Sequence, residues 1–193
     1  MPDRRTSILD AALQVFVEKG YSSATIADIR ALSGATTGSI YHFFDGKPSV
    51  AIAIWKSAND EWERLSISKR TDDTPKTIVQ ATVIGLAEWA LNNRALFLFY
   101  EELRIRALTD PDLIEIREIS KDGAQRATAV YAKWVSAGVV YDLPWPLASA
   151  LIVGPTYDYL RKSGDLEDPS TVIPKLAECA WAAVCRQGDS ATD

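Results

Sequence analysis

The sequence predicts an all-α protein, and three observations support that class. Apolar residues recur every three or four positions along most of the 193-residue chain, as they do on helices that bury one face. Glycine, proline and short polar residues interrupt this pattern where helices end or begin. The alternation of apolar and polar residues that marks a half-buried strand does not occur.

Nine helices are expected, each with a recognisable start or stop. Gly20 closes the first helix, and Pro48 lies in the first turn of the fourth, where proline is tolerated. The Gly154-Pro155 step should kink the eighth helix, because proline removes a backbone donor. The approximate ranges are 6–19, 25–33, 36–44, 47–65, 75–91, 95–108, 109–138, 146–162 and 168–186.

The second and third helices are short and separated by a tight turn. Thr25 can cap the second helix, with Asp28 three residues later as its partner. Gly34 ends that helix, and Thr36 or Thr37 begins the next. Two helices joined by a brief glycine-containing turn form a helix-turn-helix, whose second helix enters the major groove of DNA. The apolar stripe of the first of these helices consists of Ile26, Ile29 and Leu32.

The third helix has an apolar face and a small or hydrogen-bonding face. At about 100° per residue, Ile40, Phe43 and Phe44 share the face expected to pack inward. The opposite residues are short or polar, so the backbone can approach the groove and hydroxyls can reach phosphates or base edges. Lys47 follows at a helix start, where a phosphate is favoured. The DNA-contacting candidates are Thr25, Thr36, Thr37, Gly38, Ser39, Tyr41, His42 and Lys47.

Arg4 and Arg5 precede the first helix as it is expected from the sequence. They can act as an arm that reaches the DNA backbone or minor groove. An unstructured basic end is the alternative.

The first fifty residues resemble the DNA-binding domain of the TetR family of transcriptional regulators. The matching residues are Ile8-Leu9-Asp10-Ala11-Ala12-Leu13, Phe16, Glu18-Lys19-Gly20-Tyr21, Thr25, Ile29, Gly34, Ile40-Tyr41, Phe44 and Lys47. Arg30 and Phe43 depart from the usual family pattern, which often has a small residue at the first position and His or Tyr at the second. Since Phe43 cannot bond a phosphate, His42 is expected to replace it. The resemblance also implies a helical body with an effector pocket, whose last two long helices pair with those of a second subunit.

The net charge of −5 is distributed unevenly. Residues 1–56 carry six Lys and Arg against five Asp and Glu, whereas the remainder carries fifteen against twenty-one. A nearly neutral N-terminal segment neutralises few phosphates, so we expect DNA affinity to depend on a dimer.

The composition, with 47% hydrophobic and 24% charged residues, is typical of a soluble globular protein. There is no run of about 18 apolar residues and no start of signal-peptide type, so no membrane association and a cytoplasmic location are expected. Cys179 and Cys185 lie six residues apart on an expected helix and point in different directions, which does not suit a disulfide. His42 has no metal partner at the usual spacing. No metal or cofactor is therefore expected.

Aromatic residues accumulate between residues 89 and 159 and can line a small-molecule cavity between helices. A glutamate buried among them would favour a cationic ligand. The alternative is that the aromatics form plain core and the glutamates lie on the surface. The candidates for an effector pocket are Trp89, Phe97, Tyr100, Glu101, Tyr131, Trp134 and Tyr157.

The last two helices combine apolar faces with small residues that would let the helices of two subunits approach closely. The alternative is that these faces complete the core of one subunit. The candidates for a dimer interface are Leu147, Leu151, Leu176, Ala180 and Val184.

Together these features predict three segments along the chain: a helix-turn-helix domain over 1–50, an effector-binding and dimerisation domain over 51–187, and a disordered tail over 188–193. The expected function is a ligand-responsive regulator of transcription, not an enzyme. It is expected to repress by binding a palindromic double-stranded operator as a homodimer, and to be released by an unknown small-molecule effector.

Two other classes of protein stay open. One is an all-α enzyme or small-molecule-binding protein with an incidental helix-turn-helix head, although no nucleophile–base pair, metal set or phosphate loop is evident. The other is a protein-interaction module. DNA binding separates both from a regulator.

Overall fold

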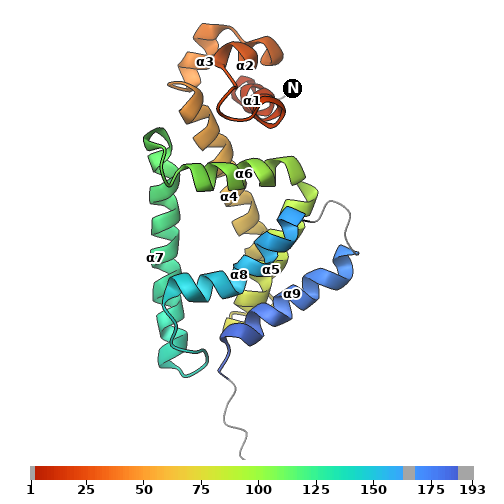
Figure 1. Cartoon of the computed structure of the whole chain (residues 1–193), viewed down its shortest axis with the longest axis vertical. Helices are drawn as coiled ribbons and strands as arrows, with labels where there is room; N and C mark the ends of the chain where they lie inside the picture. The colour runs from red at the N-terminus through yellow and green to blue at the C-terminus, as the bar shows by residue number, and fades with distance from the viewer. Residues whose placement is uncertain (1–2, 163–167, 187–193) are drawn as a thin grey trace, which may run out of the picture. The chain divides into compact units, whose positions relative to one another are not determined.

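The computed structural model describes residues 3–162 and 168–186, and every regular element within them is helical. This confirms the all-α class (Figure 1). The expected tail over 188–193 lies outside the described residues. The elements are α1 (Arg4–Lys19), α2 (Ile26–Ser33), α3 (Thr37–Phe43), α4 (Lys47–Ser68), α5 (Pro75–Asn92), α6 (Arg94–Arg106), the 3-10 turn η1 (Pro111–Leu113), α7 (Ile114–Ser136), α8 (Trp145–Lys162) and α9 (Pro169–Val184).

The helix ends lie close to the positions that the local signals predict. Gly20 follows α1 with φ 76° and Gly34 follows α2 with φ 63°, a region that glycine enters without steric cost. The segment after Asp110 begins as a 3-10 turn before it continues as α7. In Figure 1, α8 changes direction part-way along its length, in agreement with the kink expected at Gly154-Pro155.

The chain forms two compact units, each of which consists of two separate stretches of the sequence. One contains the residues up to Asp60 together with Asn93–Ser120, and the other contains Glu61–Asn92 together with the residues from Lys121 onward. The domain boundary at residue 50 stays a prediction. The first unit therefore holds α6 as well as the three N-terminal helices.

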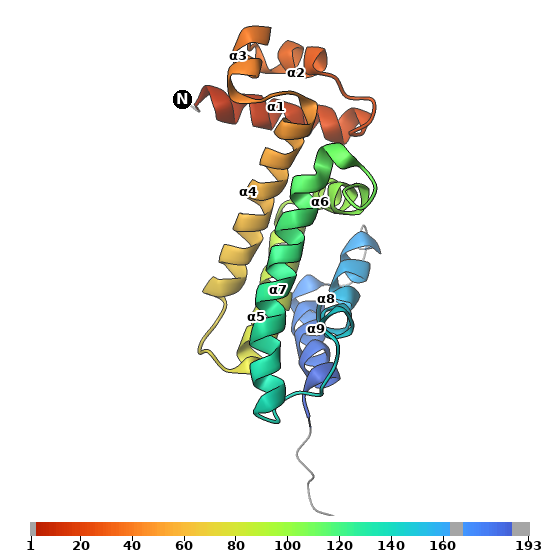
Figure 2. The same cartoon turned by 90° about the vertical axis from the view of Figure 1, so that its left-hand side faces the viewer.

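Stacked aromatic rings join α6 to its neighbours in the first unit. The rings of Phe16 and Phe99 lie 5.0 Å apart and 11° from parallel, which joins α1 to α6. The rings of Trp55 and Tyr100 lie 5.0 Å apart and 5° from parallel, which joins α4 to α6. Stacked aromatic pairs add about 0.5–1.5 kcal/mol beyond the burial of their area. The helix-turn-helix region (Figure 2) is thus anchored to α6 by large buried side chains.

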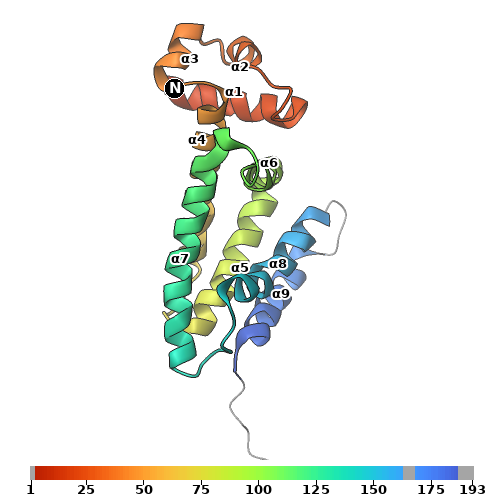
Figure 3. The ribbon, with the colours of Figure 1, turned by 60° about the vertical axis from the view of Figure 1, so that its left-hand side comes forward.

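The second unit packs α5 against α8 and α9 (Figure 3). An isolated antiparallel bridge between Val140 and Cys185 holds the end of α9, and the hydroxyl of Tyr131 donates to the carbonyl oxygen of Tyr141 at 2.8 Å. The core consists of Val79, Val83, Tyr131, Val140, Ala148, Ile152, Ala177, Ala180 and Val184.

The residues expected at a dimer interface divide between core and surface. Ala180 and Val184 are buried against α5 and α8 in the core of their own unit, so they have no free surface for a partner subunit. Their side of α9 is the one that faces α5. Leu147 is exposed, and Leu151 and Leu176 are half-buried. Any contact with a second subunit is therefore proposed for these three leucines and the exposed face of α9.

The described helices include none that is both long and apolar enough to cross a membrane. Both cysteines are free, with Cys179 exposed and Cys185 half-buried.

Candidate nucleic-acid interface

A complete capping box fixes the start of α2. The Thr25 hydroxyl oxygen accepts from the backbone N–H of Asp28 at 3.2 Å, and the Asp28 carboxylate accepts from the backbone N–H of Thr25 at 3.0 Å. The Thr25 hydroxyl also donates to that carboxylate at 2.8 Å. Since both polar hydrogens of Thr25 are given to Asp28, a DNA contact by Thr25 would compete with the cap and stays a prediction.

The same carboxylate connects α2 to the end of α1. The Lys19 ammonium lies 2.6 Å from Asp28. The hydrogen bonds to Asp28 lower the pKa of its carboxyl group to about 2. The bond from Lys19 has the largest effect, and those from the Thr25 side chain and backbone add to it. Asp28 therefore stays ionised through almost the whole pH range in which proteins fold.

We expect the acid sensitivity of the fold to depend on Asp28. Because its pKa falls from 3.8 in the unfolded chain to about 2 in the folded one, the stabilisation is fully present above pH 4 and is lost as the pH falls toward 2. Asp28→Asn should lower the melting temperature at pH 7 and flatten its decline between pH 4 and 2. Thr25→Ala should cost about 1 kcal/mol of stability at neutral pH through the lost cap. Melting curves of both variants from pH 7 to 2 test this, and an unaltered acid profile for Asp28→Asn contradicts it.

The helix α3 presents a small polar face to solvent. Thr36 caps it by accepting from the backbone N–H of Ser39 at 3.1 Å. Ile40 is buried, whereas Tyr41 is 52% exposed and His42 is exposed. At Gly38 a Cβ atom would meet nothing within 4 Å, so the backbone is open to close approach by a ligand. Thr37 is exposed and Ser39 is half-buried.

Two apolar residues expected to pack inward do not do so. Phe43 is 37% exposed and lies edge-on to His42, with their ring centroids 5.0 Å apart. The reason is that α3 ends at Phe43: Phe44 has extended backbone and turns into the core, which leaves Phe43 at the rim. Leu32 is also exposed, because α2 buries only Ile29.

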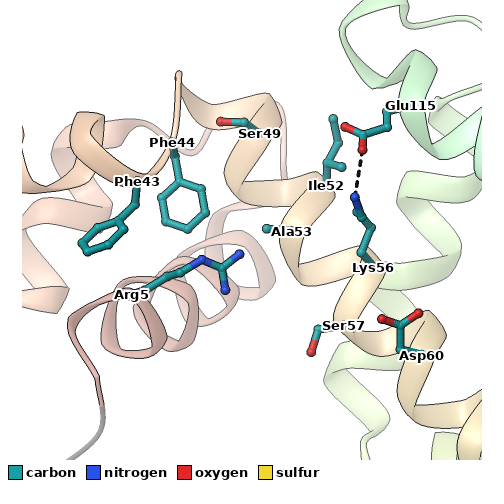
Figure 4. Close-up of a pocket in the computed structure, with 10 residues that line it drawn as sticks. All are labelled: Arg5, Phe43, Phe44, Ser49, Ile52, Ala53, Lys56, Ser57, Asp60 and Glu115. Carbon is teal, nitrogen blue, oxygen red and sulfur yellow. Dashed lines mark hydrogen bonds and ion pairs between the residues drawn. The ribbon is translucent and has the colours of Figure 1, made fainter.

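The prediction of an unstructured basic end at Arg4 and Arg5 is wrong, because both residues are helical in the first turn of α1, whereas their contact with DNA stays a prediction. The Arg5 guanidinium lies 5.4 Å from the centre of the Phe44 ring. It borders an open groove of about 450 Å³ along α4, which also contains the ion pair between Lys56 and Glu115 at 2.9 Å (Figure 4).

Lys47 has a structural role that the sequence did not reveal. Its ammonium donates to the carbonyl oxygens of Tyr21 at 2.8 Å and Ser22 at 3.1 Å, and lies 4.7 Å from the centre of the Tyr21 ring. The start of α4 is thereby tied to the turn after α1. An ammonium has three hydrogens, so one is left for the predicted phosphate contact. No local pattern signals this bond, because it joins residues more than twenty positions apart.

Tyr21 also contacts the end of α6. The Arg106 guanidinium lies 5.3 Å from the centre of its ring. The pKa of Tyr21 is raised to about 12. Burial is the largest cause, and the negative charges of Asp110 and Asp112 add to it. The phenol therefore stays neutral, and its ring receives cations from both α4 and α6.

Replacing Lys47 by methionine should affect both stability and DNA binding. The variant keeps the apolar stem but loses two bonds from a charged donor, which should cost about 2 kcal/mol. If the remaining hydrogen binds a phosphate, the slope of log affinity against log salt should fall by about 0.9 per chain. Lys56→Met on the same helix is the matched control and should alter neither quantity appreciably. Melting and salt-titration curves check both, and a Lys47→Met protein with wild-type salt dependence refutes the phosphate contact.

The expected effector residues belong to both units. Phe97, Tyr100 and Glu101 lie in the first unit, and the remaining four lie in the second. Glu101 is buried, but its carboxylate accepts from Arg104 at 2.7 and 3.3 Å, so its charge is already compensated. The four in the second unit are Trp89, Tyr131, Trp134 and Tyr157. Their grouping into one pocket stays a prediction.

The described part of the chain contains no group of three or more His, Cys, Asp or Glu side chains placed to hold a metal ion.

Comparison with known proteins places the helix-turn-helix in a family. Residues 8–54 match the family model described as bacterial regulatory proteins, tetR family. The HTH-type transcriptional regulator SrpR of Pseudomonas putida is 44% identical over 196 residues, which cover 96% of this chain and 86% of SrpR. The HTH-type transcriptional repressor KstR2 of Rhodococcus jostii is 40% identical over 58 residues, which span only 28% of that protein.

Solved structures show the same fold over nearly the whole chain. A TetR family transcription regulator from Marinobacter aquaeolei aligns with a TM-score of 0.81 at 18% identity, covering 95% of this chain and 96% of that one. A tetR family regulatory protein from Rhodococcus RHA1 aligns with a TM-score of 0.76 at 23% identity, covering 97% and 100% of the two chains. Because residues 8–54 match the family model and SrpR is 44% identical over 96% of this chain, the chain belongs to the tetR family of bacterial transcriptional regulators.

Proposed function

We propose that this regulator acts in the cytoplasm as a homodimeric repressor, which binds a palindromic operator and releases it when a small molecule binds. The observation that supports this most strongly is the exposed face of α3. Capping by Thr36 fixes the start of this short helix, and Tyr41 and His42 project from it beside the open backbone at Gly38. Such a surface can enter the major groove and contact both phosphates and base edges.

A dimer is expected because the helix-turn-helix of one subunit alone would bind DNA weakly. Helix α3 has only seven residues, and the N-terminal segment has little net positive charge. Two copies related by a two-fold axis double the contacts and read two half-sites. The exposed side of α9, with Ala182 and Ala183, offers small residues for close helix packing between subunits.

Release requires that the effector favour a conformation that does not fit the operator. Helix α6 is suited to transmit such a change to the reading head, because its Phe99 stacks on Phe16 and its Arg106 lies over Tyr21. A displacement of α6 would move α1 through the stacked rings of Phe99 and Phe16. It would also move the start of α4, because Arg106 contacts Tyr21, whose carbonyl oxygen accepts from Lys47. The effector would therefore alter where α3 is held without touching it.

A gel-shift titration with the DNA upstream of the regulator's own gene tests DNA binding. We expect a specific complex that resists an excess of unrelated competitor DNA and weakens as salt rises. If no specific complex forms with this or any neighbouring intergenic DNA at low salt, the proposed function is wrong.

A further inference from the structure

Two buried hydroxyl groups on one turn of α8 have no hydrogen-bond partner among the described residues. Thr156 is 1% exposed and its hydroxyl oxygen is unbonded. Three residues later the hydroxyl of Tyr159 is also buried and unbonded. Residues three apart on a helix lie on the same side, with Cβ atoms roughly 5–6 Å apart.

The isolation of the Thr156 hydroxyl is unusual within this chain. Ser66, Thr82 and Thr128 also lie inside helices, and each donates to the carbonyl oxygen four residues earlier at 2.7–2.9 Å. The corresponding acceptor for Thr156 is the carbonyl of Ile152, and no such bond forms. The Thr156 hydroxyl is therefore not used by its own helix.

Tyr159 is half-buried, and its buried hydroxyl differs from those of Tyr131 and Tyr100. Tyr131 donates to the carbonyl oxygen of Tyr141, and Tyr100 donates to the Asn59 side chain at 3.2 Å. A buried polar group without a partner is costly, so two on one turn call for an explanation.

The same turn has a backbone irregularity. Pro155 lies inside α8 and has no N–H to donate to the carbonyl of Leu151 four residues earlier. Two hydroxyls that can donate or accept thus lie beside a break in the helix hydrogen-bond ladder. The other buried unbonded side-chain atoms in the described part of the chain, on Trp55 and Arg106, lie singly on separate helices.

We propose that Thr156 and Tyr159 are the hydrogen-bonding end of a ligand site in the second unit. The ligand class follows from charge. Among the described residues of this unit, none of the buried side chains is charged. A charged group beside Thr156 would lack a buried counter-ion. The ligand is therefore an uncharged, mainly apolar molecule with a hydroxyl or carbonyl group.

This inference rests on the proposed function only in naming the bound molecule as the effector. It differs from the cationic ligand that a glutamate buried among the aromatics would favour, and it assigns the polar contact to hydroxyl groups.

The first test is the stability of the full chain without ligand. Thr156→Val removes the hydroxyl at nearly constant shape, so the melting temperature should stay equal or rise by a few degrees. Thr82→Val is the matched control, because its hydroxyl is bonded, and it should melt slightly lower than wild type. Tyr159→Phe and Tyr131→Phe form a second matched pair. If Thr156→Val and Tyr159→Phe lose as much stability as their controls, the two hydroxyls are already satisfied and the proposal fails.

The second test uses three probes with one ring frame: 2-naphthol, 2-methylnaphthalene and 2-naphthoate. Calorimetric titration should show that the wild-type chain binds the alcohol at least fivefold more tightly than the hydrocarbon or the anion. Thr156→Val and Tyr159→Phe should each weaken binding of the alcohol about tenfold, whereas Thr82→Val should not change it. No preference for the alcohol, or equal binding by Thr156→Val and wild type, overturns the proposal.

The gel shift separates this inference from the proposed function. If the alcohol binds through Thr156 but never displaces DNA, the site stands and effector-driven release is wrong. If DNA binds specifically but the alcohol shows no dependence on Thr156, the regulator stands and the site is wrong.

Discussion

Replacing Tyr41 by alanine should weaken operator binding about 10- to 100-fold and leave the fold intact. Tyr41 is half-exposed on the outer face of α3, and its hydroxyl has no protein partner in the described structure. A good contact with a base edge contributes about 1–3 kcal/mol, and each 1.4 kcal/mol corresponds to about tenfold in affinity. Because about half of the side chain is exposed to solvent, the melting temperature should change little.

Tyr141→Ala is the matched control for this measurement. Tyr141 is exposed to a similar degree, 47% against 52%, but lies in the second unit. It should bind the operator as the wild type does. The assignment of α3 as the reading helix fails if Tyr41→Ala binds normally, or if Tyr141→Ala weakens binding equally.

Replacing Gly85 by alanine should produce the largest loss of stability. A Cβ atom at this position in α5 would collide with the backbone N and Cα of Ser66 in α4, as well as with its hydroxyl. Overpacking costs about 1–3 kcal/mol when side chains can move aside, and here backbone must move. We expect a loss of about 3 kcal/mol or more, or roughly 6–12 °C in melting temperature for a chain of this size.

Gly123→Ala in α7 is the matched control, because its Cβ would meet only the tip of Arg126 at 3.9 Å. Alanine favours helix over glycine by up to about 1 kcal/mol, so this variant should be slightly more stable than wild type. Ser66→Gly should not rescue Gly85→Ala, since the colliding backbone atoms remain. Wild-type stability of Gly85→Ala would show that α4 and α5 do not pack this closely.

Local signals determined most of the secondary structure. The capping pair of Thr25 and Asp28, the glycines at positions 20 and 34, and the first-turn Pro48 set helix ends within a few residues of those observed. These signals act over three or four residues, so a single sequence displays them fully. The order of helices then identified the fold class.

The residues that were misplaced depend on contacts that the local pattern does not display. A helical wheel placed both Phe43 and Phe44 inward, but α3 ends at Phe43, and only Phe44 of the two is buried. Helix α9 carries apolar residues on more than one side, so periodicity alone could not show that Ala180 and Val184 face α5. Lys47 bonds carbonyls near residue 21, and the free hydroxyl of Thr156 is visible only once its surroundings are known.

In the proposed complex, two copies of α3, one from each subunit of a dimer, bind two half-sites of one operator. A footprint on the operator DNA, combined with the mass of the complex, tests this arrangement most directly. Two chains per DNA should protect two symmetric half-sites in successive major grooves, about one helical turn of 10–10.5 base pairs apart or a multiple of it. Protection of a single half-site by one chain, or a footprint that persists undiminished when Tyr41 is replaced by alanine, would contradict the account.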